Sequence, residues 1–205
     1  MGFYREQVLP RIVDKFCGIA EYRPLRERVT EGLEGDVLEI GFGSGLNLPY
    51  LPPKVNKVLA VDPSEVGRRL ATKRIAEAPV TVEPVGLDGE DLPLESESVD
   101  AALSTLTLCT IPDVDRALRE VHRVLRLGGE LHFLEHGLSP DPKVATWQHR
   151  LTPLQRRVAG GCHFDRPIER LVTDNGFVIT ELENLYLRGP KTPGYMYLGI
   201  ARKAG

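Results

Sequence analysis

The sequence predicts a doubly wound α/β fold, in which helices cover both faces of a mostly parallel sheet. Two observations indicate this class. Short apolar runs alternate with helical stretches from residue 36 onward, as they do in repeated strand–helix units. The runs are rich in Val, Leu and Ile without regular polar alternation, which is typical of strands buried on both faces. The expected strands are 36–40, 57–62, 79–84, 99–103, 130–135, 177–182 and 195–202.

Two stretches show helical spacing of their apolar residues. Residues 4–31 are expected to be helical, with breaks at Pro10 and Pro24. The pattern at 114–127 predicts the clearest helix. This helix should end at the glycine pair 128–129, because glycine tolerates a positive φ.

The composition is that of an ordinary globular domain and argues against several other classes. A chain of 205 residues suits one domain with a sizeable core. A net charge of -3 gives no basic footprint for nucleic acid. No apolar run approaches the length of a bilayer span, so we expect no integral membrane segment, and peripheral contact through the N-terminal helices stays open. The three cysteines are odd in number and form no CxxC, which favours a reducing, cytoplasmic setting.

A glycine-rich segment, VLEIGFGSG, follows the first expected strand, at the end where open α/β sheets bind their ligands. Gly41, Gly43 and Gly45 allow a strained turn and a close approach of a ligand to the backbone. The third glycine comes one residue earlier than the dinucleotide fingerprint G-x-G-x-x-G requires. Glu39, just before the turn, suits a ligand with positive charge better than a pyrophosphate.

A second acid, Asp62, ends the second expected strand. An acid at this position binds the hydroxyls of a ribose in nucleotide-binding sheets. A ribose, a positive charge and no pyrophosphate together describe S-adenosylmethionine better than NAD. The alternative is that the three glycines form a plain structural turn.

Four segments make the sequence similar to the class I S-adenosylmethionine-dependent methyltransferases: VLEIGFGSG, VLAVDPS, GLDGEDLPLESESVD and RALREVHRVLRLGGEL. The resemblance implies a Rossmann-like sheet of seven strands whose last strand, YMYLGIARK, is antiparallel. It also implies that Asp62 binds the ribose and that Asp88, Gly89 and Glu90 lie at the adenine edge. The full set of expected cofactor contacts is Glu39, Gly41, Gly43, Gly45, Asp62, Pro63, Asp88, Gly89, Glu90 and Thr105.

A closer resemblance is to the methyltransferase-like 7 group, which is associated with methylation of small thiols. It rests on STLTLCTIPD, FLEHG, the Trp147-Gln148 pair, GGCHFDR and GYMYLGIARKA. It implies a small, rather apolar acceptor, with a thiol favoured. We expect a single domain with a helical cap at 1–32, a cofactor-binding core at 33–136, and a substrate-side insertion and the last strands at 137–205.

Methyl transfer from a sulfonium needs positioning and a water-poor site but no nucleophilic side chain. Residues after the fourth and fifth strands should face the methyl group. His136 follows the fifth strand and His163 lies in an irregular stretch, 147–166, that suits a substrate lid. Each histidine is a candidate base or substrate contact, and the alternative for each is a structural role. No CxxC or HxxxH accompanies the cysteines, so no metal is expected.

Three alternatives to a thiol methyltransferase stay open. An N- or O-methyltransferase of a lipid or small metabolite would show no preference for thiols. A non-catalytic S-adenosylmethionine-binding protein would bind the cofactor and methylate no acceptor. A nicotinamide oxidoreductase would bind NADH, although the early third glycine and Leu46 argue against it.

Overall fold

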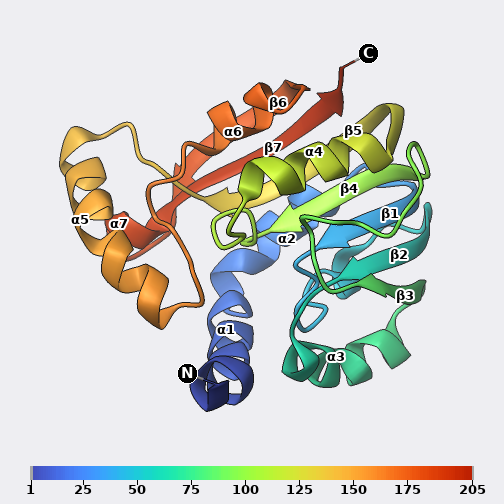
Figure 1. Ribbon diagram of the computed structural model, residues 1–205, viewed down its shortest axis with the longest axis horizontal. Coiled ribbons are helices and arrows are strands. Elements are labelled where there is room, and N and C mark those ends of the chain that lie inside the picture. Colours follow the sequence, from blue (N-terminus) through green and yellow to red (C-terminus); the bar gives the residue numbers. More distant parts are fainter. Residues whose placement is uncertain (1, 205) are drawn as a thin grey trace.

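The computed structural model describes residues 2–204, which form one seven-stranded sheet with helices on both faces (Figure 1). The strands are β1 Gly35–Ile40, β2 Val55–Val61, β3 Thr81–Gly86, β4 Val99–Thr105, β5 Leu125–His136, β6 Phe177–Tyr186 and β7 Tyr195–Lys203. The helices are α1 Leu9–Cys17, α2 Arg23–Thr30, α3 Glu65–Glu77, α4 Val114–Val124, α5 Pro142–Val158, α6 Ile168–Asp174 and α7 Lys191–Gly194. Short helical turns are η1 Tyr4–Val8, η2 Ala20–Tyr22 and η3 Leu48–Tyr50.

The sheet has the strand order β3-β2-β1-β4-β5-β7-β6. Neighbours from β3 through β5 are parallel, and β7 runs antiparallel to both β5 and β6. This confirms the predicted doubly wound sheet and its antiparallel last strand. The order reverses between β1 and β4, which creates the switch point where open α/β sheets form their ligand crevice.

Two hydrophobic clusters fill the space on the two faces of the sheet. One joins Leu118 of α4 and Val172 of α6 to sheet residues such as Leu38. The other joins Val29 of α2 and Ala71 of α3 to sheet residues such as Val37. Because successive strand residues point to opposite faces, Val37 and Leu38 enter different clusters. Figure 1 shows α4 and α6 in front of the sheet and α2 behind it.

The two N-terminal prolines stand where helices start rather than where they break. Pro10 is in the first turn of α1 and Pro24 is in the first turn of α2. Each of these helices directly continues a helical turn of another type, η1 before α1 and η2 before α2, so each proline lies where the helix type changes. The actual interruption lies between the two helices, near Gly18.

The helix predicted at 114–127 ends earlier than expected. α4 stops at Val124, and Leu125 already pairs with Val99 as the start of β5. Gly128 has a φ of +76° but lies inside β5, where the register shifts between Val99 and Ala101. The glycine pair therefore shapes an irregular strand rather than a helix terminus.

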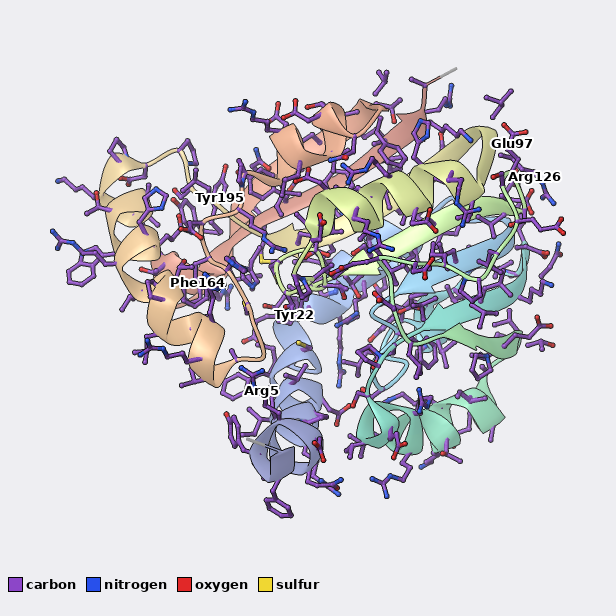
Figure 2. All side chains as sticks on the ribbon, viewed as in Figure 1. Arg5, Tyr22, Glu97, Arg126, Phe164 and Tyr195 are labelled. Carbon is purple, nitrogen blue, oxygen red and sulfur yellow. The ribbon has the colours of Figure 1, made fainter. Side chains whose placement is uncertain are left out.

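The carboxyl ends of every strand except the antiparallel β7 share one edge of the sheet, at which α1 and α5 extend away from the rest of the fold (Figure 1). The Tyr4 hydroxyl donates to the Val158 carbonyl at 2.8 Å and ties the N-terminal segment to α5. In Figure 2, Tyr22 and Phe164 lie toward this edge, whereas Glu97 and Arg126 mark the opposite edge. Within residues 2–204, no helix combines the length and the apolar character needed to cross a bilayer.

Candidate active site

The turn after β1 requires glycine at its first two glycine positions, and the physical reason differs between them. Gly41 has a φ of +73°, and a Cβ there would lie 1.9 Å from the Thr107 hydroxyl, so no side chain fits. Gly43 has a φ of +55°, but among the described residues the nearest atom to a Cβ would be the Gly41 carbonyl oxygen, at 3.8 Å. Gly41 is thus fixed by packing, whereas the space above Gly43 is open. Gly45, at +73°, completes the turn.

Glu39 lies beneath this turn and is fully buried. Its Oε1 accepts a hydrogen bond from the Asn47 side-chain amide at 2.8 Å. Its Oε2 is buried and has no hydrogen-bond partner among residues 2–204. Burial raises the pKa of Glu39 to about 7, against the opposing effects of the Asn47 hydrogen bond and the Arg26 charge. A buried carboxylate oxygen without a donor is costly unless a further group supplies one.

A buried polar network supports the Glu39 carboxylate from below. Arg26 of α2 donates to the Asn47 side-chain oxygen and, at 3.3 Å, to the Thr105 hydroxyl. Asn47 also donates to Thr105 at 3.0 Å. The same guanidinium donates to the Cys17 carbonyl at the end of α1. Thr105 was among the predicted cofactor contacts, whereas Arg26 and Asn47 were not. Asn47 could have been found from the sequence, because it is a polar residue shortly after the third glycine of the turn.

Asp62, at the end of β2, faces the same turn. Its carboxylate accepts from the Gly43 N–H at 2.8 Å and from the Ser64 N–H at 2.7 Å. Burial raises its pKa, and these two N–H groups act in the opposite direction. Pro63 is exposed beside it. The two acids predicted from sequence, Glu39 and Asp62, are therefore both brought to the glycine turn.

The predicted adenine-edge residues lie on the loop after β3. The exposed Asp88 carboxylate accepts from the Glu90 N–H at 2.8 Å and closes a local turn. Glu90 accepts from the Asp113 N–H at 2.9 Å, which joins this loop to the one after β4. Gly89 is half-buried near Ile111.

A second buried acid, Glu135, organises the loop after β4. Its carboxylate accepts from the Ser104 hydroxyl at 2.8 Å and from the N–H groups of Thr107 and Leu108 at 2.9 and 3.1 Å. Burial and then the nearby Cys109 thiol raise its pKa to about 8. The sequence analysis assigned no role to Glu135, which it placed at the end of the fifth expected strand.

Both candidate histidines adjoin a pair of cysteines. His136 Nε2 lies 3.0 Å from the Cys162 sulfur, and its ring packs on Phe164 at a centroid distance of 5.6 Å. His163 bonds through Nδ1 to the Cys109 carbonyl oxygen at 3.1 Å. The Cys109 and Cys162 sulfurs are 3.9 Å apart. A hydrogen bond from Cys162 lowers the pKa of Cys109 more than burial raises it, with further help from His136.

The turn fits S-adenosylmethionine on the grounds of its own geometry. It offers open space above Gly43, a buried Glu39 carboxylate oxygen that no described residue partners, and the Asp62 carboxylate at the next strand. A cation at Glu39 would satisfy the free oxygen, and a ribose would suit Asp62. The residues present therefore suit a ligand that has both groups.

Residues 38–133, which include the turn and both acids, match the family model described as a methyltransferase domain. The chain carries a class I S-adenosylmethionine-dependent methyltransferase domain. Solved structures share its fold. A methyltransferase structure from Bacillus halodurans has a TM-score of 0.72 at 18% identity, covering 91% of this chain and 99% of that one. An S-adenosylmethionine-dependent methyltransferase from Thermotoga maritima has a TM-score of 0.69 at 22% identity and covers 98% and 100%.

Relatives of this methyltransferase domain have several acceptors in their names. Thiol S-methyltransferase TMT1B of Rattus norvegicus is 34% identical over 154 residues, which are 73% of this chain and 63% of the relative. Thiol S-methyltransferase TMT1A of Homo sapiens is 29% identical and covers 89% and 73%. A phosphatidylethanolamine N-methyltransferase of Cereibacter sphaeroides is 28% identical and covers 80% and 77%. The chain thus spans less than two thirds of the length of the TMT1B enzymes.

Proposed function

We propose that this protein transfers the methyl group of S-adenosylmethionine to a small, rather apolar thiol. The observation that carries the proposal is the buried Glu39 Oε2, which has no hydrogen-bond partner among residues 2–204 and suits a cationic cofactor, together with the open space at Gly43 of the following turn. The thiol is favoured because relatives at 29% to 35% identity are named thiol S-methyltransferases.

The proposed cofactor contacts form three groups. Glu39 faces the positively charged part of the cofactor. The turn at Gly41, Gly43 and Gly45 contacts the cofactor through its backbone. Asp62 and Pro63 hold the ribose. We assign Asp88, Gly89 and Glu90 to the edge of the adenine. Thr105, at the end of β4, is assigned to the support of the site. The same proposal treats 1–32 as a cap, 33–136 as the cofactor-binding core and 137–205 as the substrate side of one domain.

The chemistry is an in-line displacement. The acceptor sulfur forms a bond to the methyl carbon while the carbon–sulfonium bond breaks and its electron pair stays on S-adenosylhomocysteine. A thiol must first lose its proton, which a nearby base or water takes. The chain contributes position and a water-poor surrounding. His136 and His163 are the proposed substrate-side groups, because they adjoin the loops that follow β5 and α5.

Asp62→Ala is expected to weaken binding of S-adenosylmethionine by roughly 1–3 kcal/mol, about 5- to 150-fold, if the carboxylate holds the ribose. Calorimetric titration of the folded variant measures this. Asp100→Ala is the matched control, because Asp100 also accepts a backbone N–H, from Asp36 at 2.8 Å, but at the opposite edge of the sheet. Equal affinity in the wild type and the folded Asp62→Ala variant would remove Asp62 from the ribose site.

The rate with a thiol acceptor is expected to rise up to about tenfold per pH unit below the thiol pKa of about 8.5, because only the thiolate attacks. Product formation with alkyl thiols, amines and phenols, measured side by side, checks the acceptor class. The runner-up is an N-methyltransferase of a lipid amine, which the 28% identical phosphatidylethanolamine N-methyltransferase favours. Turnover of amines without turnover of thiols would establish that second function. Cofactor binding without any turnover would instead indicate a non-catalytic binding protein.

The setting proposed for this activity is the cytoplasm, with peripheral membrane contact as an added property. Cys17, Cys109 and Cys162 are all free within the described chain, which suits a reducing compartment. Exposed Phe16 on α1 and exposed Trp147 and Leu154 on α5 offer apolar contact area. Cell fractionation with and without a salt wash distinguishes protein that is free in the cytoplasm from protein that is held peripherally at a membrane.

A further inference from the structure

Three side chains from distant parts of the sequence converge beside the proposed transfer site. Cys109 lies on the loop after β4, His136 ends β5 and Cys162 follows α5. Their two sulfurs and one imidazole nitrogen all lie within 4.8 Å of one another. The two thiols are buried, since Cys109 is 1% exposed and Cys162 is 7% exposed, whereas His136 is half-buried. Two thiols and an imidazole are the ligands that soft or borderline cations such as zinc prefer.

The sulfur–sulfur distance distinguishes a metal site from a disulfide. In a tetrahedral site with zinc–sulfur bonds of about 2.3 Å, two sulfurs lie about 3.8 Å apart. In a disulfide they lie about 2.05 Å apart. Cys162 donates a hydrogen bond to Cys109 over a sulfur–sulfur distance of 3.9 Å, which excludes a disulfide and is also close to the distance that a tetrahedral site would set. The 3.0 Å distance from His136 to Cys162 is shorter than the roughly 3.5 Å a shared zinc would set, so a small outward movement of the imidazole is required.

The loops that present these side chains are held by other groups. Arg166 donates to the carbonyl oxygens of Leu108 and Ile111, on either side of Cys109. The His163 N–H donates to the Cys109 carbonyl at 2.8 Å. These bonds fix the backbone around Cys109 without using its sulfur, so the thiol remains available as a ligand.

We propose that Cys109, His136 and Cys162 form a binding site for a divalent cation of the zinc type, whose fourth position is taken by none of residues 2–204 and is left to a non-protein ligand. Three protein ligands and one open position are the arrangement of catalytic rather than structural zinc sites. Two thiolates would neutralise the charge of the cation, so the filled site adds little net charge to the buried region. Metal binding would release the protons of the two thiols.

The open position suits the acceptor, and this step rests on the proposed thiol methylation. An acceptor thiol that coordinates the cation loses its proton to solvent, because a coordinating thiol is deprotonated outright. Its sulfur then bonds to the methyl carbon as the carbon–sulfonium bond breaks. S-adenosylhomocysteine and a neutral thioether result, and the thioether is the weaker ligand and leaves. The balance of atoms and charge closes without an oxidant or reductant.

The test is a titration of the full chain, reduced and freed of metal by a chelator, with Co²⁺ as a coloured probe and Zn²⁺ as competitor. We expect one Co²⁺ per chain, with thiolate-to-cobalt absorption that Zn²⁺ abolishes. Cys109→Ser and Cys162→Ser should each lower the affinity by roughly 100-fold or more, since loss of a supporting group alone costs about 10–100-fold. Cys17→Ser is the control and should bind as the wild type does.

Two outcomes would overturn the metal site. One is no stoichiometric Co²⁺ or Zn²⁺ binding to folded wild type with its thiols reduced. The other is equal loss of binding in Cys17→Ser, which would show that the metal is held elsewhere. Circular dichroism of each variant identifies loss of the fold, and His136→Asn provides a further variant if a serine variant does not fold.

The role of the open position is tested separately from the proposed function. Thiol turnover that falls with the chelator and returns with Zn²⁺ supports it. Thiol turnover that is equal in the wild type and Cys109→Ser would overturn it and leave the proposed function intact. Stoichiometric metal binding without any thiol turnover would leave the metal site standing and remove thiol methylation itself.

Discussion

Replacing Glu39 by glutamine is expected to weaken binding of S-adenosylmethionine by about 10- to 100-fold at about pH 8, while the folded protein becomes no less stable. The glutamine keeps an oxygen that can accept from Asn47, as Oε1 of Glu39 does at 2.8 Å. It removes the negative charge that would face the cofactor's positive group. It also removes the cost of burying a carboxylate whose second oxygen has no partner among the described residues.

The pH dependence of this effect follows from the raised pKa of Glu39. Its ordinary value of 4.5 becomes about 7 in the folded chain, chiefly through burial. Between these two values the folded state binds more protons than the unfolded state, so Glu39 lowers stability progressively as the pH rises. Above about 7 the cost is constant, on the order of 3 kcal/mol. Below about 4.5 both states are protonated and the cost is absent.

Cofactor affinity should show the opposite trend. Wild-type binding should strengthen as the pH rises through about 7 and Glu39 ionises, and Glu39→Gln should lack this increase. Calorimetric titration and thermal unfolding, each at about pH 6 and about pH 8, measure both effects. Asp100→Asn is the control, because its carboxylate lies at the opposite edge beside Arg126. A Glu39→Gln variant that binds as tightly as the wild type at both pH values would contradict the assignment.

Gly43→Val is expected to abolish measurable cofactor binding. Valine at a φ of +55° costs about 1–2 kcal/mol of backbone strain. Its side chain would also occupy the open space above the turn, where the cofactor is proposed to approach. The loss of binding should therefore exceed what the loss of stability explains.

Gly128→Val separates strain from occlusion. Gly128 has a φ of +76°, and a Cβ there meets nothing within 4 Å among residues 2–204. It lies near the start of β5, away from the carboxyl edge. Both valine variants should lose similar stability in thermal unfolding, but only Gly43→Val should lose the cofactor. If the two bind S-adenosylmethionine alike, the turn does not approach the ligand.

The sheet was predictable because its signal is local. Each strand is a short apolar run, and all seven expected runs became strands, with bounds that moved by a few residues. The predicted end of α4 was wrong because Leu125 and Leu127 continue the apolar helical spacing. Pairing of Leu125 with Val99, a tertiary contact, decides that the chain becomes a strand there. The prolines at 10 and 24 were placed correctly in helical segments, but their position inside each first turn depends on where each helix begins.

The site was predictable only where its residues are near in sequence or follow strand ends. Glu39, the three glycines and Asp62 meet those conditions, and the structure brings them together. Arg26 reaches the site from a helix that precedes the sheet, so nothing local indicated it. The approach of Cys109, His136 and Cys162 depends on the crossings of the chain between β4 and α6, and their spacing of about 26 residues matches no short motif.

The two outer strands of the sheet are protected against aggregation. β3 contains Pro84, which removes one backbone donor, and its register shifts between Ala60 and Val61 of the neighbouring strand. β6 has a bulge between Ile179 and Glu181, followed by exposed Glu181 and Glu183. Proline, bulges and outward charges all hinder pairing with a strand from a second molecule. Concentrated solutions of the folded chain should therefore resist fibril-type association.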